Sequence, residues 1–171
     1  WVLDVAEAEN LLLIEPIVKE VAGHMGRDMN DVFNQVQQNI TRFFADQIDN
    51  QILLHYKEML RREYLALSNF TSQDITSALT EIDSVYGGID KQAIYTQIDT
   101  EFRDILARQD YNAILRIFNL KNALIPNSKV CELTGIRNKL EYKNITITLL
   151  KKKNAISDNI KAGIDSKIIK N

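Results

Sequence analysis

Two glutamates near the start of the chain have the chemistry and spacing of a candidate metal-binding pair. Glu7 and Glu9 follow the short stretch Val-Leu-Asp-Val at residues 2–5, which is expected to be a strand. In an extended chain, side chains two residues apart project to the same side. Carboxylates just past the end of a strand suit a hard cation such as Mg²⁺. The alternative is that one of them stabilises the N-terminus of the following helix through the helix dipole. A complete metal site needs further carboxylates from other strands.

The basic C-terminal end is a second candidate site. From Lys129 to Asn171 the sequence holds ten Lys/Arg and four Asp/Glu, whereas the preceding residues hold eleven and nineteen. A basic end on an acidic body is suited to contact with phosphate or an acidic partner, and the alternative is a solvated, lysine-rich helix pair. No aromatic residue lies among the lysines after Tyr142, which argues against base stacking. The candidate phosphate contacts are Lys151, Lys152, Lys153, Lys161, Lys167 and Lys170.

Other reactive residue types form no recognisable motif. The sequence contains no GxxxxGK[ST] and no GxGxxG phosphate-binding motif. His24 and His55 lack metal-ligand partners at helical spacing, so we expect helix-end or surface histidines. Cys131 is the single cysteine, and we expect a buried, small apolar residue. One cysteine excludes a disulfide scaffold and favours a reducing, cytoplasmic location. The sequence has no run of 18 apolar residues, so no membrane span is expected.

The pattern along the chain predicts a mainly α, multi-helix fold behind a short N-terminal strand. The chain has 171 residues with only two prolines and six glycines, so long uninterrupted helices are allowed. Residues 1–5 read as a strand that needs neighbours for its backbone groups. Pro16 suits the first turn of a helix that Gly26 ends. From Asp28 or Asn30, apolar residues then recur at helical spacing to about Leu67, as one long helix or as two with a break near residues 46–50.

Capping residues predict where the later helices begin. Thr71 is the expected cap of a helix that continues to Tyr86, and Asp90 starts the next one. Asp110 or Asn112 starts a short helix at residues 113–118. Residues 119–127 are expected to be irregular, with a turn at Pro126, before Ser128 caps a helix at 129–133. Two final helices are expected at residues 140–153, where β-branched residues leave a strand as the alternative, and at 155–169.

The opening stretch VLDVAEAENLLLIEPIVKEVA resembles the segment that follows the TOPRIM core in a bacterial domain-of-unknown-function family. Members of this family are TOPRIM-like and related to the OLD nucleases. The match consists of a strand, then the acid–Asn pair Glu9-Asn10, and then the leucine run at residues 11–13. A weaker match covers residues 114–152, where Leu120 replaces a family glycine. The residues that fit there are Lys121, Leu124, Ile136, Tyr142, Leu149 and Leu150.

This resemblance implies both a partner and an origin for the chain. Such proteins are fused to, or encoded beside, an ABC/AAA-type ATPase, and several belong to anti-phage defence systems. The resemblance assigns residues 1–14 to the end of a truncated TOPRIM-like α/β core and residues 15–171 to a helical C-terminal domain. The Mg²⁺-binding acids of TOPRIM nucleases match no residue here, and only Glu9 lies at the edge of that region. We therefore expect no cofactor and no catalysis in these residues, and Mg²⁺ only in a full-length parent nuclease.

Three functions remain open from the sequence. The first is a packing and docking region of an ATPase-associated, TOPRIM-like nuclease, which also guides nucleic acid and docks on the ATPase or on a second copy. The second is a stand-alone helical protein–protein interaction module. The third is a nucleic-acid-binding domain that uses the basic C-terminus, and its affinity would fall steeply with salt.

Overall fold

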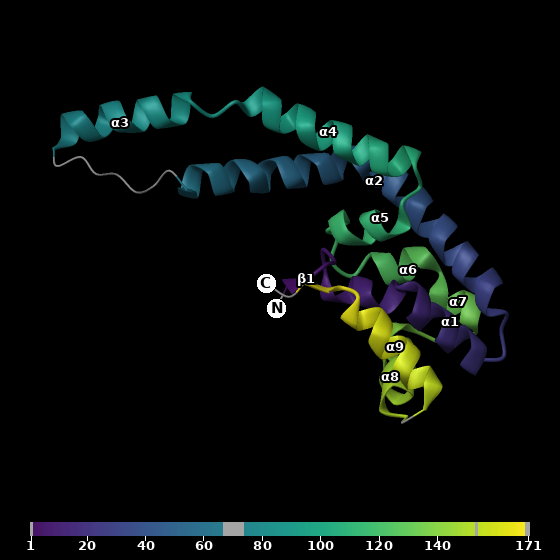
Figure 1. The fold of residues 1–171 in the computed structure, drawn as a ribbon. Coiled ribbons are helices and arrows are strands. Elements are labelled where there is room, and N and C mark those ends of the chain that lie inside the picture. Colours follow the sequence, from purple (N-terminus) through teal and green to yellow (C-terminus); the bar gives the residue numbers. More distant parts are fainter. Residues whose placement is uncertain (1, 67–73, 153, 170–171) are drawn as a thin grey trace. The chain divides into compact units, whose positions relative to one another are not determined.

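The computed structural model describes residues 2–66, 74–152 and 154–169, and the chain is mainly helical, as predicted (Figure 1). It forms two compact units. The first unit contains residues 1–46 and 105–171, and the second contains residues 47–104. Helices α2 (Met29–Ala66) and α4 (Lys91–Ala107) each contribute residues to both units. The expected boundary at residue 14 does not coincide with this division, because residues 1–14 belong to the first unit.

The two short strands of the first unit lie near the N-terminus and near the C-terminus of the sequence, and its other elements are helices. Its N-terminal elements are β1 (Val2–Leu3), the 3-10 helix η1 (Ala8–Leu13) and α1 (Glu15–His24). After α4, the chain forms α5 (Tyr111–Ile117), α6 (Leu124–Ser128), α7 (Val130–Thr134), α8 (Lys139–Lys151), α9 (Ala155–Asp165) and β2 (Ile168–Ile169).

Strand β1 pairs with the C-terminal end of this same chain. Val2 lies opposite Ile169 and Leu3 opposite Ile168 in an antiparallel pair. The Asp4 N–H continues the ladder by donating to the Lys167 carbonyl at 2.6 Å. The strand was expected to be the end of a truncated α/β core, but its partner strand lies within this same chain. The backbone groups of so short a strand need partners, and the residues that follow α9 provide them.

Local signals set several helix boundaries as predicted. Pro16 lies in the first turn of α1, and Gly26 takes a positive φ of 70° just after that helix. The Asp28 carboxylate accepts from the N–H groups of Asn30 and Asp31 at 3.0 and 2.7 Å, which caps α2. Asp110 caps α5 in the same way through the Ala113 N–H. Between residues 29 and 66, α2 is one continuous helix.

Other boundaries differ from the prediction. Residues 124–127, expected to be irregular, form α6 together with the expected cap Ser128. Pro126 lies in the first turn of this helix, where its missing N–H costs nothing. The segment expected at residues 140–153 forms helix α8, although its β-branched residues had left a strand as the alternative. Helix α9 ends at Asp165 instead of continuing to Ile169, because the next residues pair with β1. The expected cap Thr71 lies outside the described residues.

The core of the first unit joins α1 to the C-terminal helices. Four residues of α1 at helical spacing are buried: Ile17, Val18, Val21 and Ala22. Helices α8 and α9 lie beside each other and against α1 (Figure 1). The approach of α9 to α1 is close at Gly163, where a Cβ atom would lie 2.7 Å from Cγ of Pro16. Gly163 therefore has no room for a side chain.

The second unit is built on the C-terminal part of α2, on α3 (Ile75–Gly87) and on most of α4. Aromatic side chains connect its helices. The rings of His55 and Phe102 lie 4.8 Å apart between α2 and α4, and those of Tyr64 and Tyr86 lie 5.0 Å apart between α2 and α3. None of the described helices combines the length and the apolar character that a membrane span requires.

Candidate functional site

Glu9 lies in a helix and forms an ion pair. The prediction placed Glu7 and Glu9 on one side of an extended chain, but only Glu7 is extended, with φ −134° and ψ 142°, and η1 starts at Ala8. The Glu9 carboxylate pairs with Nζ of Lys139, which also donates to Oδ1 of Asn122 at 2.8 Å. The structure thus brings Glu9 to a lysine rather than to other acids. Among the described residues, no group of three or more His, Cys, Asp or Glu side chains has the arrangement of a metal site.

The neighbouring Asn10 is a buried structural residue. Its side chain is only 1% exposed and donates to the carbonyls of Leu115 at 2.8 Å and Phe118 at 3.1 Å. These carbonyls lie at the C-terminal end of α5, where a helix leaves acceptors without intrahelical donors. Asn10 therefore attaches η1 to the end of α5. No local sequence signal indicates this role, because both acceptors lie more than 100 residues away in the sequence.

Two buried tyrosines fix the leucine run that follows Asn10. The Tyr111 hydroxyl donates to the Leu13 carbonyl at 2.7 Å, and the Tyr142 hydroxyl donates to the Leu12 carbonyl at 2.9 Å. Burial raises the pKa of both hydroxyls above the ordinary tyrosine value. Both groups therefore stay protonated at neutral pH and act as hydrogen-bond donors. The motif that carries the family resemblance is thus used here to hold η1 against α5 and α8.

The four candidate phosphate-binding lysines that the structure describes do not lie at one place. Lys151 and Lys152 are exposed at the C-terminal end of α8. Lys161 is exposed on α9, with its Nζ 3.9 Å from the Asp158 carboxylate. Lys167 follows α9 and donates to Oδ1 of Asn112 at 2.9 Å. Because the eleven residues of α9 span about 16 Å, Lys167 lies well away from Lys151. Lys153 and Lys170 lie outside the described residues.

The two histidines and the cysteine lie on three different helices, α1, α2 and α7. His24 is exposed at the end of α1, as predicted, and His55 packs its ring against Phe102. Cys131 was expected to be buried but is partly exposed. Partial burial and the nearby Glu141 carboxylate raise the pKa of its thiol. A raised pKa disfavours the reactive thiolate.

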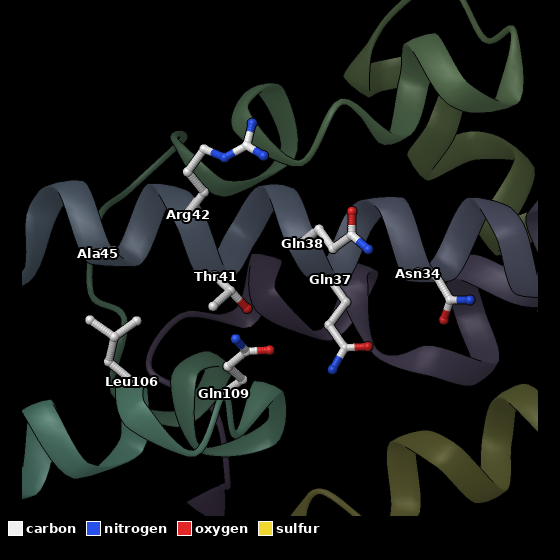
Figure 2. A pocket seen from close by; sticks show the side chains of 8 residues that line it. All are labelled: Asn34, Gln37, Gln38, Thr41, Arg42, Ala45, Leu106 and Gln109. Carbon is white, nitrogen blue, oxygen red and sulfur yellow. The ribbon is translucent and has the colours of Figure 1, made fainter.

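A polar hollow of about 470 Å³ lies in the first unit between α2 and the turn after α4 (Figure 2). Gln37 and Thr41 point from α2 toward the turn that carries Gln109, whose backbone takes a positive φ of 52°. The lining has amide, hydroxyl and guanidinium groups but no carboxylate, so it offers no general acid or base at neutral pH. The lining residues are Asn34, Gln37, Gln38, Thr41, Arg42, Ala45, Leu106 and Gln109.

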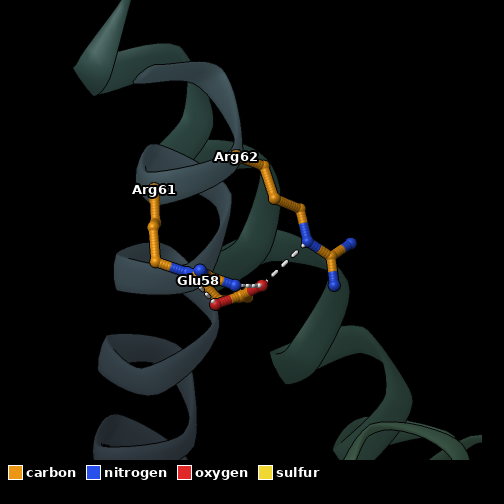
Figure 3. Close-up of polar contacts among 3 residues, drawn as sticks. All are labelled: Glu58, Arg61 and Arg62. Atoms are coloured by element: carbon orange, nitrogen blue, oxygen red, sulfur yellow. Dashed lines mark hydrogen bonds and ion pairs between the residues drawn. The ribbon is translucent and has the colours of Figure 1, made fainter. Parts of the chain in front are cut away.

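A charged cluster lies on α2 in the second unit. The Glu58 carboxylate accepts from Arg61 Nε and Nη2 at 2.9 Å each and from Arg62 Nε at 3.0 Å (Figure 3). These hydrogen bonds lower the pKa of Glu58 from 4.5 to about 2. The partners are three and four residues away on the same helix. The cluster therefore belongs to the surface of α2 and connects no two elements.

The low pKa of Glu58 gives a direct test of this cluster. Replacing Arg61 and Arg62 together with glutamine is expected to return the pKa of Glu58 from about 2 toward 4.5, because the hydrogen bonds to the ionised form are lost. The measurement is the carboxyl ¹³C shift of Glu58 followed by NMR against pH. Lys57→Gln removes one neighbouring charge without touching Glu58 and should leave the low value. An equal pKa in all three proteins would contradict the assigned hydrogen bonds.

Comparisons with protein-family models, with curated proteins and with solved structures found no match to this chain.

The feature that sequence reasoning missed is a set of exposed apolar side chains in the second unit. The described part of the chain has ten large apolar side chains that are exposed, and six of them lie within residues 47–104. The six residues lie on α2, α3 and α4, and the apolar pattern of a helix does not by itself show which of its side chains the tertiary packing leaves exposed. The six residues, here called the second-unit apolar set, are Leu53, Leu54, Leu65, Ile75, Leu79 and Tyr95.

Proposed function

We propose that this chain is a helical docking module in which the first unit is the scaffold and the second unit binds a protein partner. The supporting observation is the second-unit apolar set. The unit holds about a third of the residues but most of the exposed large apolar side chains of the described chain. A large exposed apolar patch is typical of a protein–protein interface. The remaining four exposed residues are Met25, Met29, Leu140 and Ile147 in the first unit.

Helix α3 carries the two most regularly spaced members of the second-unit apolar set. Ile75 is 74% exposed and Leu79 is 55% exposed. They are four residues apart, so they lie on the same face of the helix one turn from each other. Fully burying such a side chain against a partner contributes about 1.5–3 kcal/mol. A partner that covers both residues gains enough apolar burial to make them central to the interface.

The family resemblance supports an ABC/AAA-type ATPase as the partner to test first. In this proposal, the chain packs and docks beside a Mg²⁺-dependent, TOPRIM-like nuclease in the cytoplasm and has no catalytic role. Strand β1 pairs within the chain, so the docking proposal depends on the second unit and not on an unpaired strand. A second copy of the chain is the alternative partner.

The test is binding of the purified chain to the ATPase encoded with it, measured by calorimetry. The double variant Ile75→Gln, Leu79→Gln is expected to weaken binding at least about tenfold, because it removes two apolar contacts. Its effect on the unfolding free energy should be small, since both positions are exposed.

The matched control is Leu140→Gln, Ile147→Gln, which makes the same chemical change on α8 of the first unit. This pair should bind as tightly as the unchanged chain. The proposal is wrong if the unchanged chain does not bind the ATPase, or if the control pair weakens binding as much as the α3 pair.

A further inference from the structure

A small hollow in the second unit has an unusual combination of lining groups. It measures about 200 Å³ and lies between α2 and α4. The rings of Tyr56 and Tyr95 meet edge to face, with centroids 6.3 Å apart and an interplanar angle of 86°. Asp49 and Asp99 provide two carboxylates, while Ile52 and Leu53 provide apolar surface. We call these six residues the Tyr–Asp notch.

Each carboxylate of the notch has one oxygen that accepts a hydrogen bond from Arg103. Arg103 donates from Nη2 to Oδ1 of Asp49 at 3.0 Å and from Nε to Oδ1 of Asp99 at 2.9 Å. Among the described residues, no donor meets the Oδ2 atom of either aspartate, and no donor or acceptor meets the hydroxyl of Tyr56 or Tyr95. One guanidinium against two carboxylates leaves a net charge of −1, and Arg103 does not line the hollow. The notch therefore keeps two acceptor oxygens for a further cation.

The aromatic rings indicate which kind of cation fits. The faces of tyrosine rings attract ammonium and guanidinium groups, and carboxylates form strong charge-assisted hydrogen bonds with the same groups. A divalent metal is a poor fit, because six or more oxygens are its usual ligand set and the notch offers two carboxylates beside apolar walls. Nucleic acid is repelled, because residues 47–104 hold ten Asp/Glu against five Lys/Arg.

We propose that the Tyr–Asp notch binds an arginine side chain of the docking partner. This inference deepens the proposed docking function and rests on it for the partner. The planar guanidinium has donors for both Oδ2 atoms and stacks on aromatic rings. Leu53 and Tyr95 belong both to the notch and to the second-unit apolar set, so the arginine would enter at the edge of the docking surface. The partner surface therefore carries an arginine next to apolar residues.

The test uses the full chain and a small probe, so it does not depend on the partner. N-acetyl-arginine methylamide is titrated against the ¹⁵N-labelled protein and followed by NMR. The amide signals of Tyr56, Tyr95 and Asp99 are expected to shift saturably, and added salt should weaken the effect. N-acetyl-citrulline methylamide has nearly the same shape without the charge and is expected to cause no saturable shift. The inference is overturned if the arginine probe causes no shift, or if both probes cause the same one.

Variants assign the binding to the notch. Asp99→Asn and Tyr95→Leu are each expected to weaken probe binding about threefold or more. Arg103→Gln frees both Oδ1 atoms and is expected to tighten binding about threefold. Glu101→Gln removes one exposed charge from α4 outside the notch and should leave binding unchanged. Weaker binding in Arg103→Gln, with helicity intact by circular dichroism, would overturn the arrangement.

The probe experiment tests the notch, and the partner experiment tests the docking function. If the arginine probe binds but the ATPase does not, the docking function as proposed is wrong and the notch stands as a guanidinium site. If the ATPase binds but the probe does not, the docking function stands and the notch proposal is wrong.

Discussion

Replacing Tyr142 with alanine is expected to lower the free energy of unfolding by about 3–5 kcal/mol, the largest effect of any single change considered for this chain. Tyr142 is 0% exposed, and it is among the largest side chains that are fully buried in the described chain. Alanine removes the ring, leaves a cavity in the first unit and leaves the Leu12 carbonyl without its donor. The measurement is urea unfolding followed by far-ultraviolet circular dichroism.

Two further substitutions separate the contributions to this effect. Tyr142→Phe keeps the ring and removes only the hydroxyl, so the expected loss is about 1–2 kcal/mol. Tyr95→Ala removes the same number of atoms from a side chain that is 43% exposed, and the expected loss is about 1 kcal/mol or less. A loss for Tyr142→Ala no larger than that for Tyr95→Ala would contradict the packing around η1 and α8.

The raised pKa of Tyr142 adds a pH dependence to the same experiment. The pKa in the folded chain lies well above the value of 10.0 that applies to an exposed tyrosine. The unfolded chain therefore loses this proton first, and stability that is fully present below about pH 10 falls as the pH rises further. Tyr142→Phe has no such proton, and its stability should decline less between about pH 10 and 11.

Replacing Asn10 with alanine is expected to lower the free energy of unfolding by about 2–4 kcal/mol. The side-chain amide of Asn10 donates both of its hydrogens to buried carbonyls more than a hundred residues away in sequence. The Leu115 carbonyl also accepts from the Ala6 N–H at 3.2 Å, but no such second bond is present among the described residues for Phe118. Alanine thus leaves the Phe118 acceptor unsatisfied inside the protein. Urea unfolding again provides the measurement.

Asn159→Ala is the matched control for Asn10→Ala. Asn159 also donates through its side-chain amide, to Glu20 at 2.9 Å, but this hydrogen bond is exposed. Its loss is expected to change the unfolding free energy by about 0.5 kcal/mol or less. Equal losses in the two variants would show that the burial of Asn10 does not matter for stability. A larger loss for Asn10 would support a structural use of the Glu9–Leu13 motif.

Glu7 and Glu9 illustrate what the sequence could predict about a site and what it could not. The spacing of Glu7 and Glu9 suggested a pair of carboxylates, but Glu9 meets Lys139 instead. That partner lies 130 residues away, and nothing near Glu9 in the sequence indicates it. Likewise, the exposed pair Ile75 and Leu79 has the same apolar pattern as a buried pair would have. The sequence therefore identified residues with useful chemistry but not the contacts that decide how they are used.

The sequence by itself determined the mainly helical fold and many of its helix ends. Apolar residues at helical spacing and the capping residues Asp28, Asp90 and Asp110 act within a few residues of themselves, so their effect is visible in the local pattern. The tertiary structure alone decided the pairing of β1 with β2, the burial of Asn10 and the exposure of the second-unit apolar set. Each of these depends on which distant segment supplies a hydrogen bond or covers a side chain, and that choice is made by the packing of the whole chain.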